Sequence, residues 1–167
     1  MTLALIATPK ATDANTYSTL AEAETYHEAR LHNTDWSGAT TATKNSALAW
    51  ATRLLDELIE WDGFQTDSDQ ALRFPRSGIF DYDGNYFDPD LIPTWLKNAT
   101  AEFAMSLITS DRVKESDLKG FSSIKVASIR LNADKYDNPA FVPPNVWEII
   151  QDYGQRKSQR IKQLTRG

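Results

Sequence analysis

The sequence predicts a mainly α-helical fold: a small helical bundle with a long inter-helix loop, a short β-hairpin or strand region, and extended N- and C-terminal arms. Three observations predict it. Apolar residues recur at helical spacing in several segments. Residues 62–92, between two of these segments, contain little that favours a further helix, because proline and glycine interrupt them. Residues 121–131 contain β-branched residues in partial alternation.

The 167 residues are expected to form one domain with an appendage, and 41% of them are hydrophobic, enough for a core of modest size. We divide the chain into consecutive regions. They are an N-terminal arm over 1–16, a helical core over 17–110 that contains the long loop 62–92, a strand and connector region over 111–145, and a C-terminal helix with a basic tail over 146–167.

A first helix is predicted from Thr19 to Leu31. Thr19 and Glu22 have the spacing of a capping box, in which a hydroxyl and a carboxylate each accept a free N–H of the first turn. His27 and His32 lie on or just after this helix. No further ligand set stands near them, so we interpret both as surface or capping groups and predict no metal site.

The second helix, over residues 41–60, is predicted to be the spine of the core and follows a turn over 33–39. Trp61 is expected to end it and Gly63 to stop it. Burying each large aliphatic side chain of its last turns is worth roughly 1.5–3 kcal/mol. Its apolar stripe consists of Ala47, Leu48, Ala51, Leu54, Leu55, Leu58 and Ile59.

A hairpin turn is predicted at Asp83-Gly84, between aromatic flanks. The alternating acids nearby suggest a calcium loop, but an EF-hand needs glycine at its sixth position and glutamate at its twelfth. Here Gly84 is fourth and Ile92 is twelfth, so we exclude that interpretation.

The last elements follow in order. A third helix is expected from Pro93, whose missing N–H costs nothing in a first turn, to about Ser110. One strand or two short ones are expected over 121–131, and a short helix is expected over 146–153.

The most unusual stretch of the chain lies in the long loop and includes large apolar residues, two arginines and a glutamine. Such residues are too apolar for a disordered segment, so the loop must pack against something. We expect it to form an interface or a structural motif. Its members are Trp61, Gly63, Gln70, Leu72, Arg73, Phe74, Pro75, Arg76 and Gly78.

No catalytic constellation is recognisable, and we predict no enzymatic activity and no cofactor. Arginines and aromatic residues interleave in the long loop, a pattern typical of single-strand binding. Aspartates in the same stretch would repel phosphates, and the net charge of −5 argues against strong general affinity for nucleic acid. A protein partner therefore suits the composition better. No apolar run is long enough for a membrane span.

The C-terminal segment has the opposite charge to the body. From Gln151 onward there are five basic residues and one acidic residue. Such a tail suits an acidic partner surface or nucleic acid, although a solvated helix face is an equally good interpretation. The basic residues are Arg156, Lys157, Arg160, Lys162 and Arg166.

Several segments together resemble a known family. They cover 17–26, 47–56, 61–63, 70–78 and 92–102. The most specific is Gln-Ala-Leu-Arg-Phe-Pro-Arg-Ser-Gly at 70–78, where Phe74 replaces an expected tryptophan. The chain resembles the tailed-phage head-to-tail adaptor (connector, head-completion) family, which includes members labelled DnaT-like single-stranded-DNA-binding protein.

The resemblance implies a structural virion protein at the head–tail junction (neck), made in the host cytoplasm. Copies would form a ring, usually of twelve, between the portal and the next neck or tail component. The ring would extend the channel through which packaged double-stranded DNA passes without sequence-specific binding, and no cofactor is implied. The basic tail residues, Arg156 to Arg166, are then candidates for portal contact.

Two other functions remain open at this point. The protein is alternatively a single-stranded-DNA-binding accessory factor of replication, or a helical interaction module unrelated to virions. The first alternative predicts DNA affinity that weakens steeply with salt.

Overall fold

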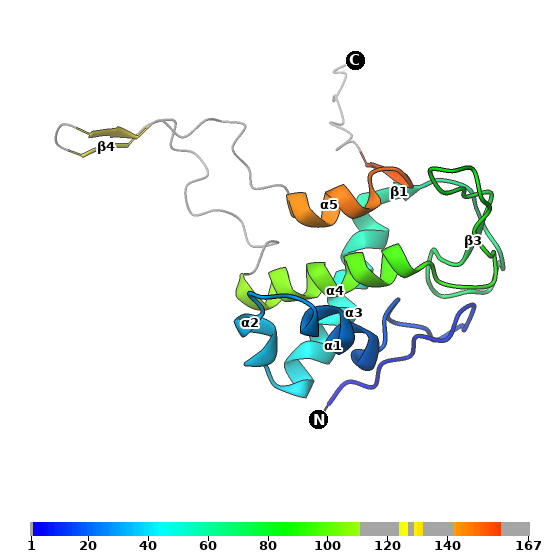
Figure 1. The fold of residues 1–167 in the computed structure, drawn as a ribbon, viewed down its shortest axis with the longest axis horizontal. Coiled ribbons are helices and arrows are strands. Elements are labelled where there is room, and N and C mark those ends of the chain that lie inside the picture. The colour runs from blue at the N-terminus through cyan, green and yellow to red at the C-terminus, as the bar shows by residue number, and fades with distance from the viewer. Residues whose placement is uncertain (1, 111–123, 127–128, 132–141, 158–167) are drawn as a thin grey trace, which may run out of the picture.

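The computed structural model describes residues 2–110, 124–126, 129–131 and 142–157 (Figure 1). The mainly helical prediction is confirmed. Within these ranges, helix α4 packs against four other helices, and Figure 1 shows it at the centre of the molecule. The helices are α1 (Leu20–Glu28), α2 (Thr34–Ser37), α3 (Thr41–Leu58), α4 (Thr94–Thr109) and α5 (Pro144–Ile150).

The helix starts follow the predicted local signals. Thr19 caps α1 with its hydroxyl while Glu22 accepts the Thr19 backbone N–H at 2.8 Å, so the capping box is confirmed. Thr40 caps α3 by accepting the backbone N–H of Thr43. Pro93, predicted in the first turn of this helix, is instead the N-cap residue directly before α4.

The ends of three helices differ from the prediction, and one of these is α5, which covers Pro144–Ile150 where a helix over 146–153 is expected. Helix α3 stops at Leu58 because Ile59–Trp61 form strand β1, which pairs antiparallel with β6 (Gly154–Arg156). Helix α1 stops at Glu28, and the expected turn over 33–39 contains the short helix α2. The end of α3 therefore depends on a strand almost a hundred residues away, which no local pattern reveals.

The other strands are short. Strands β4 (Ile124–Val126) and β5 (Ile129–Leu131) pair antiparallel, so the predicted strand region consists of two strands. Within the long loop, β2 (Phe64–Gln65) pairs with β3 (Arg76–Ser77). The predicted turn at Asp83-Gly84 is closed by a single bridge between Phe80 and Tyr86.

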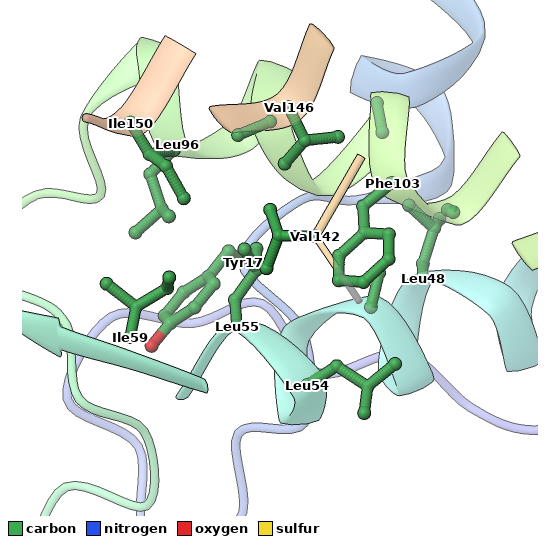
Figure 2. Packing of buried hydrophobic residues seen from close by; sticks show 14 of the residues in the cluster. Tyr17, Leu48, Leu54, Leu55, Ile59, Leu96, Phe103, Val142, Val146 and Ile150 are labelled. Carbon is green, nitrogen blue, oxygen red and sulfur yellow. The ribbon is translucent and has the colours of Figure 1, made fainter. Parts of the chain in front are cut away.

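The core lies where α3, α4 and α5 meet, and Figure 2 shows its packing. Tyr17, in the segment before α1, is fully buried among these helices. Apolar side chains at helical spacing supply the rest, as the sequence predicts. Those of these three helices include Leu48 and Leu55 of α3, Leu96 and Phe103 of α4, and Val146 and Ile150 of α5.

The N-terminal arm is docked on its own subunit. Asn15 closes the arm on itself by accepting the Ile6 N–H at 2.9 Å. Asn45 of α3 donates to the Leu3 carbonyl at 2.8 Å. Lys10 forms an ion pair with Asp90 at the end of the long loop. The arm thus contains no helix or strand among its described residues, yet it is held along its length.

A polar cluster joins α1, α4 and α5. Glu102 of α4 is buried and accepts hydrogen bonds from Arg30 and from Asn145 at the start of α5. The buried His27 ring of α1 lies against Trp36, and its Nε2 is 3.0 Å from the Ala101 carbonyl. This histidine is therefore a core residue, which corrects the prediction of a surface or capping group.

Candidate functional site

Phe74 anchors the long loop to the core. Its ring is buried and meets Tyr17, Trp61 and Trp95 edge-on at centroid distances of 6.0, 5.2 and 5.5 Å. Such edge-to-face aromatic contacts stabilise beyond the area they bury. The Phe74–Pro75 peptide bond is cis. The predicted motif is therefore a structural one, docked on its own helices.

Gln70 and Leu72 organise the turn that precedes this anchor. The buried Gln70 side chain donates to the carbonyls of Leu72 and Pro75 at 2.8 and 3.1 Å. Its oxygen accepts the Asp67 N–H at 3.1 Å. Leu72 is half-buried against the core. Because one amide satisfies three backbone groups, this segment keeps a fixed shape without a helix or an extended sheet.

Arg76 binds the backbone of its own loop with every nitrogen of its guanidinium group. Nε donates to the Asp62 carbonyl at 2.7 Å, and one terminal nitrogen donates to the Gly63 carbonyl at 2.6 Å. Longer bonds reach the carbonyls of Trp61 and Arg73. Burial and the neighbouring Arg73 charge lower the pKa of Arg76. The contacts of Arg76 therefore lie within one subunit, a point that the sequence leaves open.

The two glycines of the motif allow the loop to close. Gly63 has φ of +68° and Gly78 has φ of +79°, in the left-handed region that favours glycine. A Cβ atom on Gly63 would lie 2.2 Å from the Ser77 carbonyl oxygen. Gly63 thus permits β2 and β3 to pair closely, and the prediction that it stops a helix is wrong.

Asp56 of α3 connects the loop to the core, and the sequence analysis missed it. Its carboxylate accepts hydrogen bonds from the Tyr17 hydroxyl, the Trp61 indole and the Arg73 backbone N–H. Burial raises the pKa of Asp56, although these donors oppose the shift. The sequence offers one signal for this role: an acidic residue directly follows Leu55 of the apolar stripe.

The surface beside Asp56 is basic and contains two hollows. A hollow of about 670 Å³ and a second of about 770 Å³ share two lining residues, Arg73 and Lys157. Arg76 also lines the first hollow and Arg53 the second, while three acidic residues contribute negative charge, namely Asp56, Glu57 and Glu60. We call this surface the basic groove.

Arg73 is the exposed cation at the centre of the basic groove. Its N–H donates to Asp56 at 3.1 Å and its carbonyl accepts from Arg76, so its backbone is fixed on both sides. Among the residues that the structure describes, its guanidinium makes no ion pair, and the Lys157 ammonium donates only to the Asp56 carbonyl. Phe64 stands in the chain between Gly63, which lines the first hollow, and Gln65, which lines the second, and it is 77% exposed.

The basic C-terminal residues fall into two groups. Arg156 belongs to β6 and lies over the Trp147 ring at 4.4 Å, and the Lys157 N–H donates to the Leu58 carbonyl. Both are thus held by their own subunit. Arg160, Lys162 and Arg166 lie outside the described residues, so a portal contact for them stays a prediction.

A second exposed surface is acidic and aromatic. Residues 80–86, which we call the acidic turn, display Phe80, Tyr82 and Tyr86, and Tyr82 is fully exposed. The rings of Phe80 and Tyr86 meet at 5.4 Å. Asp81 accepts the Asn85 N–H at 2.7 Å, which fixes the turn.

In the described part of the chain, no three His, Asp or Glu side chains come together as a metal site requires. Nor is any helix there long and apolar enough to cross a membrane. The acidic turn is a loop held by local hydrogen bonds and forms no such metal site.

The geometry can be compared with known proteins. A family model described as "Putative DnaT-like ssDNA binding protein" matches residues 1–163. The chain belongs to this family. The match spans the helical core, the long loop and most of the basic tail. No curated protein and no solved structure matches the chain.

Proposed function

We propose that this member of the DnaT-like family binds single-stranded DNA in the basic groove. The family assignment supports this proposal, and the observation that carries it is the exposed guanidinium of Arg73 on a fixed backbone between two hollows. Phosphates would meet Arg73, Lys157 and Arg53, and a base would stack on the exposed ring of Phe64. Charge combined with aromatic stacking is how single strands are held without sequence preference.

The proposal is tested by fluorescence anisotropy with a labelled oligothymidine at low salt. We expect Arg73→Gln to weaken binding about tenfold and to reduce the slope of log affinity against log salt by about 0.7, the loss of one phosphate contact. Phe64→Ala should weaken binding with little change in that slope. The control Ser37→Asp makes the same change of net charge on α2, and it should bind as the wild type does. Absence of wild-type binding at low salt contradicts the proposal.

A second candidate function is the adaptor ring of a tailed-phage neck. The resemblance of residues 70–78 to the head-to-tail adaptor family supports it, as does the exposed aromatic surface of the acidic turn in a chain of net charge −5. In this function the copies form a ring beneath the portal, with a neck or tail protein on the other side, in the virion.

Mixing the protein with purified portal rings and imaging the product separates the two candidates. A stacked ring supports the adaptor, while failure to bind portal under conditions in which the oligonucleotide binds supports the DNA-binding role. The neighbouring genes give an independent observation, because portal and major capsid genes upstream and tail genes downstream indicate a neck protein.

A further inference from the structure

The acidic turn has the chemistry of a docking surface. It presents three exposed aromatic rings beside two carboxylates, Asp81 and Asp83, within seven residues. Tyr82 is fully exposed, and the mutual packing of Phe80 and Tyr86 leaves about half of each ring in water. Exposed apolar clusters of this kind mark interaction sites. The surrounding charge selects a basic partner, since an acidic one would be repelled.

The chain itself contains a segment of matching composition. Residues 158–167 carry Arg160, Lys162 and Arg166 and no acidic residue. Ile161 and Leu164 stand between these cations, so apolar and basic groups alternate along the segment. Arginine and lysine bind aromatic faces as well as carboxylates. The segment therefore matches both features of the acidic turn.

The direction of β6 favours a second copy as the provider of this segment. β1 leads directly into the long loop, and β6 runs antiparallel to it, from Gly154 opposite Trp61 to Arg156 opposite Ile59. The next residue, Lys157, continues in this direction to the Leu58 carbonyl. The described chain thus ends at the α3 end of β1, opposite the end that leads into the long loop, and the ten residues beyond Lys157 span up to about 35 Å when extended.

We propose that residues 158–167 of one copy bind the acidic turn of a second copy. The contact joins two different surfaces, so it is heterologous and leaves a free turn and a free tail on the pair. Further copies add in the same way. This inference is independent of DNA binding, and it competes with the predicted portal contact for the same three cations.

The test uses full-length proteins in sedimentation velocity at low salt over a range of concentrations. Wild type should self-associate, and association should weaken as salt is raised. A turn variant, Tyr82→Ala with Asp83→Lys, and a tail variant, Arg160→Glu with Lys162→Glu, should each lower the association constant at least tenfold. Both altered side chains of the turn are exposed and make no hydrogen bond within the described residues, so its fold should be kept.

Mixing the two variants gives the decisive result. The turn variant retains an intact tail and the tail variant retains an intact turn, so the mixture should form a one-to-one heterodimer. The control Glu28→Lys alters an exposed acid on α1 and should associate as wild type does. A wild type that stays monomeric throughout, or variants that fail to combine, overturns the proposal. Oligonucleotide binding by the turn variant is a separate readout of the basic groove.

Discussion

At the scale of single residues, Arg76 shows why the motif contains a guanidinium. Four carbonyls, two of them from Trp61 and Gly63, converge on one side chain whose nitrogens lie in a plane. A lysine ammonium has the charge but not this fixed fork of donors. Arg76 therefore holds the β1 end, the β2–β3 turn and the Phe74 anchor together.

We expect Arg76→Ala to lower the free energy of unfolding by about 1.5–3 kcal/mol, because it leaves partly buried carbonyls without a donor. Arg76→Lys should recover only part of this loss. Urea denaturation monitored by tryptophan fluorescence measures both changes. The control Arg53→Ala removes an exposed cation paired with Glu57 at 3.8 Å and should cost less than about 0.5 kcal/mol. Equal effects of Arg76→Ala and Arg53→Ala would contradict the role assigned to Arg76.

His27 links stability to pH. Burial lowers its pKa, although the Ala101 carbonyl opposes this shift. The folded protein therefore binds a proton at this site less readily than the unfolded chain does, for which the imidazole pKa is about 6.5. Stability consequently rises with pH across the range at and below that value, and it falls as the pH decreases.

For His27 we predict a loss of unfolding free energy of at most about 1.4 kcal/mol per pH unit below pH 6.5, which is the limit for one proton. Denaturation curves recorded between pH 5 and pH 7.5 measure this slope. His27→Gln should flatten it, although it also lowers stability at neutral pH. The matched control His32→Gln changes an exposed imidazole and should keep the wild-type slope. An unchanged slope in His27→Gln would assign the pH dependence to other groups.

At the scale of elements, the pairing of β1 with β6 ties the C-terminal segment to the end of α3. The Asp62 backbone N–H donates to the Tyr153 carbonyl at 3.0 Å, and the Tyr153 ring stacks on Trp95 at a centroid distance of 4.1 Å. The strand pair therefore closes over the aromatic cluster that anchors the loop. It also sets the direction in which the basic tail leaves the domain.

Gly154→Ala tests this pairing. A Cβ atom there would lie 2.9 Å from the Glu60 carbonyl oxygen and 2.9 Å from the Ile59 Cγ2 methyl carbon, so the strands must separate. We expect a loss of about 1–3 kcal/mol, the usual cost of an overpacked site. The control Gln155→Ala alters an exposed residue of the same strand and should be nearly neutral. Hydrogen exchange of the β1 and β6 amides should accelerate in Gly154→Ala and not in the control.

At the scale of the whole molecule, two surfaces of opposite charge have separate proposed partners. The basic groove is centred on Arg73 and the acidic turn on Tyr82, and both belong to the same long loop. The loop is held by buried anchors, so its two exposed parts are supported independently. Interactions at one surface should therefore add to those at the other without coupling.

We accordingly expect Arg73→Gln to leave self-association unchanged and the turn variant to leave the salt dependence of oligonucleotide binding unchanged. Anisotropy and sedimentation on the same protein preparations measure the two properties together. A turn variant that loses both properties would indicate that DNA binding requires the assembled form.

The sequence by itself determined the positions of four of the five described helices, all but the short α2, because capping residues and apolar spacing act within one or two turns. Thr19 and Glu22 begin α1 as predicted, and Pro93 begins α4. The sequence also revealed the motif of the long loop, because the residues of this motif are too apolar for a solvated segment.

Only the tertiary structure decided what those residues contact. The acceptors of Arg76, the partners of Asp56 and the strand that ends α3 all lie far away along the chain or in irregular backbone. Periodicity carries no information about such pairings. The long loop proved to be fixed within its own chain, and its exposed surfaces, in the basic groove and the acidic turn, are the parts that remain for partners.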